Sequence, residues 1–159
     1  MRVDAGLPDR VLAVPHVLVA SDAPWIREEV RSVLGSETTI DNVSHGRAVQ
    51  GAVIARTPDL VIVDSQIGSM GGIAVTLDLH NEESGGRLPH IPVLMLLDRQ
   101  PDVYLARQSN VEGYLVKPLD PLRLGRAIAA VLGGATFEDR AQMGDASTNY
   151  RSTPDSSAR

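Results

Sequence analysis

The pentapeptide Leu60-Val61-Ile62-Val63-Asp64 decides the fold of this chain. Its first four residues are apolar without a polar interruption, which is typical of a strand buried on both faces of a parallel sheet. Asp64 follows at the carboxyl end of this strand, where open α/β sheets bind their ligands. We therefore expect a parallel sheet with a functional site at the end of this strand.

Two further apolar runs end in polar residues. Asp22 comes shortly after the run at 17–20, and Lys117 directly follows the run at 113–116. The carboxyl ends of parallel strands meet at one edge of a sheet, so we expect these side chains to converge on Asp64. Two carboxylates and an ammonium group can together hold a divalent cation and a phosphoryl group. The pattern favours signalling chemistry over metabolism.

The rest of the chain alternates between the two kinds of secondary structure. Further strands are expected at 38–43 and 91–97, and helices at 24–34, 44–56, 73–80, 103–109 and 122–132. Five strands alternating with five helices predict a doubly wound, five-stranded parallel sheet, an α/β fold of the flavodoxin-like type. We expect this single domain to span residues 16–132, after an N-terminal extension at residues 1–15.

The segment at residues 133–159 differs from the alternating part. It is rich in polar residues and has too little apolar surface to offset the entropy of an ordered chain. We therefore expect a polar C-terminal tail that is disordered unless a partner binds it. A tail of this length and composition cannot encode a DNA-binding or catalytic output domain.

Bulk composition narrows the class of protein. The net charge is −5, no cluster of lysine or arginine occurs, and aromatic residues make up only 3% of the chain, which argues against nucleic acid as a direct partner. The sequence has no cysteine, so disulfides and thiolate metal sites are excluded. It also lacks an apolar run long enough to insert into a membrane, and its start lacks a secretory signal. The expected location is cytoplasmic.

Four features together resemble the receiver domain of bacterial two-component response regulators. They are Ser21-Asp22 at the usual acidic pair, Asp64 at the phospho-acceptor, Tyr114 at the switch aromatic, and Lys117-Pro118 at the lysine-proline pair. The resemblance covers residues 16–132. Each feature alone is weak, whereas their joint spacing within five strand–helix units is specific.

The resemblance implies a role for each of these positions. Asp64 would be the nucleophile that accepts the phosphoryl group, and Lys117 would pair first with Asp64 and then with a phosphoryl oxygen. Weakly bound Mg2+ would be held by Asp22, Asp64 and the backbone carbonyl of Gln66. Tyr114 would be the switch aromatic, although a simple packing role is the more economical interpretation.

Two departures from the family pattern affect function. Ser21 replaces the first acid of the pair, which weakens the cation site by one charge. Leu97 stands where the family has a serine or threonine that binds the phosphoryl group, and leucine cannot donate a hydrogen bond. Such a bond is worth roughly 1.5–3 kcal/mol, while a full switch between two states needs about 5.5 kcal/mol. Leu97 therefore argues against the usual phosphorylation-driven switch, but not against phosphorylation.

Two functions remain open. In the first, the chain is a stand-alone receiver that accepts a phosphoryl group on Asp64 with Mg2+ and acts by binding a protein, with a histidine kinase as phosphodonor. In the second, it is a degenerate receiver that serves constitutively as an accessory subunit of a larger complex. Neither is an enzyme beyond self-phosphorylation and slow self-dephosphorylation. A flavodoxin-like or hydrolytic enzyme fits the fold, but no phosphate-binding loop or nucleophile–base pair is recognisable.

Overall fold

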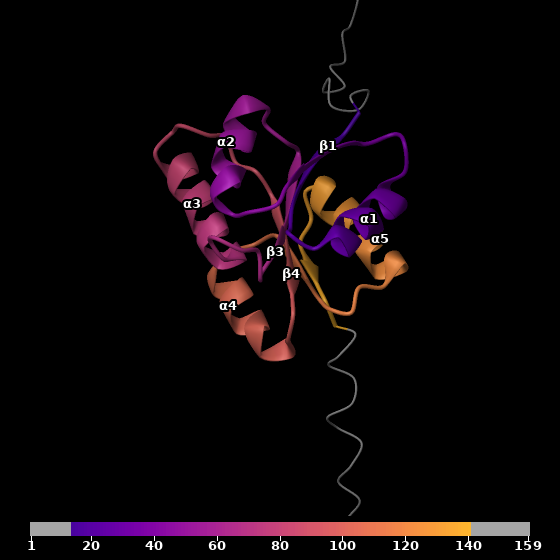
Figure 1. Cartoon of the computed structure of the whole chain (residues 1–159). Coiled ribbons are helices and arrows are strands. Elements are labelled where there is room, and N and C mark those ends of the chain that lie inside the picture. The colour runs from indigo at the N-terminus through magenta and orange to yellow at the C-terminus, as the bar shows by residue number, and fades with distance from the viewer. Residues whose placement is uncertain (1–13, 141–159) are drawn as a thin grey trace, which may run out of the picture.

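A six-stranded parallel sheet forms the centre of the molecule, in the order β2-β1-β3-β4-β5-β6 (Figure 1). The computed structural model describes residues 14–140. The strands are β1 (His16–Ala20), β2 (Thr39–Val43), β3 (Leu60–Asp64), β4 (Val93–Leu97), β5 (Gly113–Val116) and β6 (Phe137–Glu138). The helices are α1 (Pro24–Leu34), α2 (Arg47–Ala55), α3 (Gly72–Ser84), α4 (Val103–Gln108) and α5 (Pro121–Leu132), with the short 3-10 helix η2 (Gln100–Asp102) before α4.

Helices cover both faces of the sheet, so the molecule has two cores. Helices α2, α3 and α4 lie on one side and α1 and α5 on the other (Figure 1). Strand β3 divides its side chains between them, because successive residues of a strand point to opposite faces. Val61 and Val63 belong to the core under α2–α4, and Leu60 and Ile62 to the core under α1 and α5. This arrangement confirms the α/β fold with a doubly covered parallel sheet and five helices.

The sixth strand corrects the expectation of five. Strand β6 runs parallel to β5, with Gly113 opposite Phe137 and Tyr114 opposite Glu138. It lies within the segment that the sequence predicts to be a tail, and the buried carboxylate of Asp139 follows it directly. A strand of two residues carries no readable alternation, so the apolar pattern does not reveal it. The other predicted tail residues, 141–159, and the predicted extension at 1–13 lie outside the described residues.

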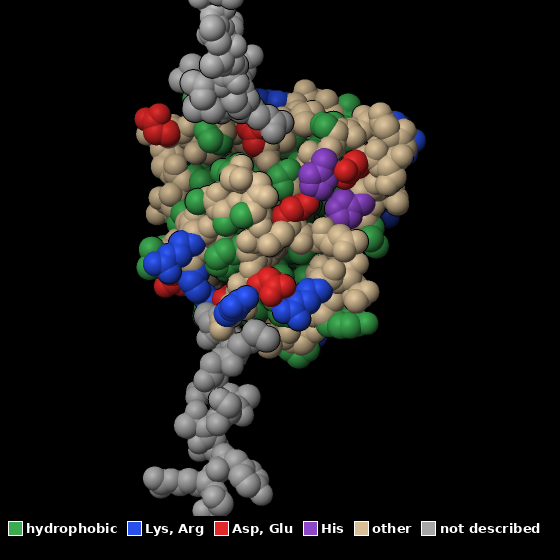
Figure 2. All heavy atoms as spheres, turned by 180° about the vertical axis from the view of Figure 1, so that it is seen from behind, with side chains coloured by type: hydrophobic (Ala, Val, Ile, Leu, Met, Phe, Trp, Pro, Cys, Tyr) green, Lys and Arg blue, Asp and Glu red, His purple; other side chains and the backbone are tan. Residues whose placement is uncertain are grey.

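The surface of the described part is mixed in character. On the face seen in Figure 2, acidic, basic and histidine side chains are interspersed with scattered hydrophobic groups. No helix within residues 14–140 combines the length and apolar character needed to cross a bilayer.

Candidate functional site

The carboxyl ends of β1, β3, β4 and β5 meet at one edge of the sheet and bring four polar side chains together. The register between strands pairs Ala20 with Val63 and Asp64 with Leu96, so Ser21, Asp64 and the residues that follow β4 lie at neighbouring strand ends. The first residue of helix α3, Gly72, packs against the backbone of Asp64. Glycine is required at this position, because a Cβ there would lie 2.8 Å from the Asp64 backbone oxygen.

Asp64 is buried, with 3% of its surface exposed, and both of its carboxylate oxygens accept hydrogen bonds. Oδ1 accepts from the Lys117 ammonium group at 2.8 Å and from the backbone N–H of Gln66 at 3.1 Å. Oδ2 accepts from the Ser21 hydroxyl at 3.1 Å. A buried carboxylate needs such partners. In this protein Ser21 supplies a donor to Asp64 instead of a second acidic group.

Lys117 is shared between two carboxylates. Its Nζ lies 2.8 Å from Asp64 Oδ1 and 2.6 Å from Asp98 Oδ1. Burial acts to lower the pKa of Lys117, but the hydrogen bonds and charges of Asp64 and Asp98 outweigh this effect and raise the pKa above its ordinary value. The ring of Trp25 lies 6.0 Å from the same nitrogen and is half exposed. Lys117 is therefore a firmly protonated cation at the centre of the site.

Asp98 is the site residue that the sequence analysis missed. It comes directly after the apolar run that forms β4, as Lys117 comes directly after β5. The reasoning that singled out Asp64 and Lys117 would have found it if applied to every strand end. The family pattern places its functional hydroxyl one residue earlier, at Leu97, and gives no role to the position of Asp98.

The residues expected to hold Mg2+ are partly assembled. Asp22 is exposed at the end of β1, and its Oδ2 would lie 3.3 Å from a Cβ added at Gly68, so this carboxylate faces the loop that follows Asp64. Gln66 lies in a tight turn in which its N–H donates to Asp64. Within residues 14–140, no three carboxylate, imidazole or thiol groups gather as a preformed metal site. Mg2+ needs only one or two carboxylates and keeps several waters, so this donor set fits it.

Leu97 and Tyr114 lie beneath the site in one buried cluster. Leu97 is 1% exposed and Tyr114 is 3% exposed. The Tyr114 hydroxyl accepts a hydrogen bond from Arg107 Nη2 of α4 at 3.2 Å, and the same nitrogen lies 3.3 Å from Glu138 of β6. The aromatic ring is thus turned inward and held there by contacts away from Asp64.

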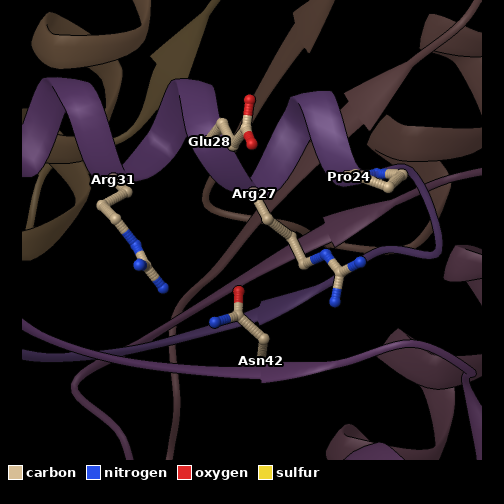
Figure 3. Close-up of a pocket in the computed structure, with 5 residues that line it drawn as sticks. All are labelled: Pro24, Arg27, Glu28, Arg31 and Asn42. Carbon is tan, nitrogen blue, oxygen red and sulfur yellow. The ribbon is translucent and has the colours of Figure 1, made fainter.

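A separate pocket lies between α1 and β2. It has a volume of about 220 Å³ and is lined by Pro24, Arg27, Glu28, Arg31 and Asn42. Figure 3 shows that the two arginine side chains extend from α1 toward Asn42 of β2. None of Asp64, Asp98 and Lys117 lines this pocket. This pocket is therefore separate from the candidate site, in which charged side chains converge at the strand ends.

The fold and these strand-end residues define a receiver domain, and comparison with known proteins shows the same. The response regulator receiver domain family matches residues 17–129, so the chain belongs to this family. An uncharacterized response regulatory protein of Mycobacterium tuberculosis is 30% identical over 133 residues, which cover 79% of this chain and 96% of that protein. The nitrate/nitrite response regulator protein NarL of Escherichia coli is 27% identical over 123 residues, covering 74% of this chain but only 55% of NarL.

Solved structures agree on the architecture. The signal receiver domain of the putative response regulator NarL from Mycobacterium tuberculosis superposes with a TM-score of 0.64 at 26% identity, covering 76% of this chain and 97% of that one. The chemotaxis response regulator CheY4 of Vibrio cholerae gives a TM-score of 0.66 at 21% identity, covering 75% and 99%, and supports the fold alone.

Proposed function

We propose that this protein is a stand-alone receiver that accepts a phosphoryl group on Asp64 and acts by binding another protein. The observation that carries the proposal is the buried Asp64 carboxylate with the Lys117 ammonium 2.8 Å away, at the shared edge of four strands in a receiver fold. A histidine kinase is the expected phosphodonor. Beyond taking up and slowly losing this group, the protein would not be an enzyme.

The proposed step is a displacement at phosphorus. One carboxylate oxygen of Asp64 forms a bond to phosphorus, the bond from phosphorus to the leaving group breaks, and the leaving group departs with the electron pair. Charge builds on the equatorial oxygens during such a transfer, so catalysis consists largely of positioning and neutralisation. Ser21 and the Gln66 N–H hold the carboxylate in place. Lys117 would then pair with a phosphoryl oxygen.

Asp22, Asp64 and the backbone carbonyl of Gln66 are the groups that would hold Mg2+. The bound ion would supply positive charge to the phosphoryl oxygens. Because Ser21 replaces a carboxylate in this set, we expect weaker binding than two strand-end acids would provide.

The second candidate is a degenerate receiver that binds its partner constitutively, as an accessory subunit of a larger complex. Leu97 favours this alternative, because it offers no hydrogen bond to a phosphoryl group. The inward position of Tyr114 favours it too, since its contacts with Arg107 exist in the unphosphorylated protein. Under this proposal Asp64 and Lys117 form only a structural ion pair.

Intact-protein mass spectrometry after incubation with acetyl phosphate and Mg2+ separates the two candidates. The receiver proposal expects a gain of one phosphoryl group in the wild type and none in Asp64→Asn. Omitting Mg2+ should abolish the gain, and Asp22→Asn should raise the Mg2+ concentration needed for half-maximal modification. An unmodified wild type would leave the constitutive subunit as the better proposal.

A further inference from the structure

Asp98 and Asp64 compete for one ammonium group. The distances from Lys117 Nζ are 2.6 Å to Asp98 and 2.8 Å to Asp64, so neither contact is secondary to the other. Their surroundings differ sharply, however. The Asp98 side chain is 40% exposed, whereas the Asp64 side chain is 3% exposed. Asp98 therefore pairs with Lys117 at the surface of the site, whereas Asp64 is enclosed.

The strand ends keep Asp98 beside Lys117. Leu97 pairs with Val116 in the sheet, and the backbone N–H of Lys117 donates to the Leu97 carbonyl at 2.8 Å. The residues that directly follow these two are thus neighbours by register. Arg99, the nearest cation along the chain, is engaged with Asp102 at 3.2 Å. Lys117 is the cation with which Asp98 pairs among the described residues.

A phosphoryl group on Asp64 would lie next to the ion pair between Lys117 and Asp98. It needs Lys117 as its cationic partner, and an ammonium group has donors only, so it orients toward whichever anions surround it. Asp98 would either retain Lys117 or stand as a like charge next to the phosphoryl oxygens. Both possibilities disfavour the phosphorylated state.

We propose that Asp98 is a positioning residue that holds Lys117 against an arriving phosphoryl group and so limits the phosphorylated fraction of Asp64. This inference rests on the proposed receiver function and adds a regulator to its site. In this arrangement the protein carries its own anionic competitor at the end of β4. A cation-binding role for Asp98 would have the opposite consequence, because removing its charge would then weaken phosphorylation.

The test measures the initial rate and final extent of Asp64 phosphorylation by acetyl phosphate and Mg2+ in Asp98→Asn and Asp98→Ala. Asp102→Asn is the matched control, since it removes one negative charge from the same β4–α4 connection without contacting Lys117. We expect both Asp98 variants to exceed the wild type by roughly three- to tenfold, the effect of removing a partly screened like charge. Asp102→Asn should match the wild type. Equal or slower phosphorylation of the Asp98 variants would overturn the inference.

A second readout does not depend on phosphorylation. The pKa of Lys117, followed by NMR of the labelled side chain, should fall in Asp98→Asn and stay unchanged in Asp102→Asn, because Asp98 is one of the groups that raise it. An unchanged Lys117 pKa in Asp98→Asn overturns the inference even if Asp64 is phosphorylated. If only the Asp98 variants accept phosphate, the competitor role is supported and the wild-type receiver function is not. If no variant accepts phosphate, both proposals fail as statements about phosphorylation, and a lowered pKa then shows only a structural pair.

Discussion

At the scale of single residues, the site depends on a buried negative charge with few partners. Asp64 is almost completely enclosed, and its hydrogen bonds come from Lys117, Ser21 and the Gln66 backbone. Of these three donors only Lys117 carries a charge. Because the two ends of this ion pair are desolvated, removal of the cation leaves a charge that water cannot reach.

Lys117→Met should therefore destabilise the unphosphorylated protein. We expect a loss of about 3 kcal/mol in the free energy of unfolding, the lower end of the range for an unbalanced buried pair. Urea denaturation of the wild type, Lys117→Met, Asp64→Asn and the double variant measures it. The double variant should be less destabilised than the sum of the single changes. A neutral or stabilising Lys117→Met would mean that water relieves the Asp64 charge.

His90 gives the protein a dependence on pH that is independent of the site. Its Nδ1 lies 2.9 Å from Glu83 and its Nε2 lies 2.6 Å from Glu112, and only the protonated ring can donate from both nitrogens. The hydrogen bond with Glu83, aided by Glu112, raises the pKa of His90 above its ordinary value of 6.5. The folded state therefore binds this proton more tightly than the unfolded chain does.

The direction in which stability changes with pH follows from this difference in proton binding between the folded and unfolded states. The contribution of His90 to stability should be complete below pH 6.5 and lost as the pH rises through the elevated folded-state pKa. Since half of the His90 side chain is exposed, the loss should not exceed about 1 kcal/mol. Denaturation midpoints measured from pH 5.5 to about 8.5 should show the decline in the wild type and not in His90→Gln. Persistence of the full decline in His90→Gln would assign it to another group.

At the scale of elements, the amount predictable from the sequence follows the strength of the local signals. Helices α1 and α5 begin with proline and carry one clear apolar face, and their predicted bounds agree with the structure to within one residue. Helix α3 extends to Ser84 instead of ending at His80, because the chain turns only at Gly85-Gly86, where the backbone of Gly86 is left-handed. The apolar runs of β3 and β5 predict that Asp64 and Lys117 lie at strand ends on the same edge of the sheet and converge there. Asp98 follows from the same rule, because it comes directly after the apolar run of β4, whereas strand β6 has only two residues and shows no pattern.

Asp139 fixes β6 to β5 and α5. Its Oδ2 accepts from the backbone N–H of Val116 at 3.0 Å, and both oxygens lie 2.9 Å from Nη1 of Arg123. Arg123 in turn donates to the Pro118 carbonyl at 2.9 Å, next to Lys117. One buried carboxylate thus satisfies a backbone donor of β5 beyond the end of β6 and orders the connection that follows the site lysine.

Asp139→Ala should destabilise the protein by about 3 kcal/mol, because it leaves a buried N–H and a partly buried guanidinium without their acceptor. Glu138→Ala is the control one residue earlier. Its ion pair with Arg107 is solvent-exposed, so it should change stability by less than about 1 kcal/mol. Similar losses in the two variants, measured by urea denaturation, would contradict the anchoring role of Asp139.

At the scale of the whole molecule, the strand order determines where chemistry can occur. The chain order reverses between β1 and β3, which are adjacent in the centre of the sheet. This switch point leaves an opening at the carboxyl ends of the strands. Ser21, Asp22 and Asp64 flank it, while Asp98 and Lys117 close it from the β4 and β5 side. Helices on both faces bury the strands themselves, so the polar side chains of the site gather at the strand ends.

The contribution of the last described residues can be isolated by two truncations, one ending after Arg140 and one after Gly134. They differ only by residues 135–140, which contain β6, the ion pair between Glu138 and Arg107, and Asp139. The shorter protein should be less stable by at least the loss expected for Asp139→Ala, about 3 kcal/mol. It should also release the Tyr114 ring, because Arg107 loses its second partner, and this can be followed by tyrosine fluorescence.

Phosphorylation should respond differently from stability in the same pair. Asp22, Asp64, Asp98 and Lys117 are present in both truncations, so acetyl phosphate should modify the folded fraction of each to the same extent. Loss of modification in the shorter protein, under conditions in which circular dichroism shows it folded, would mean that β6 supports the site through Arg123 and Pro118. Equal stability of the two proteins would instead show that the sixth strand contributes nothing to the fold, because the five-stranded sheet would then be sufficient.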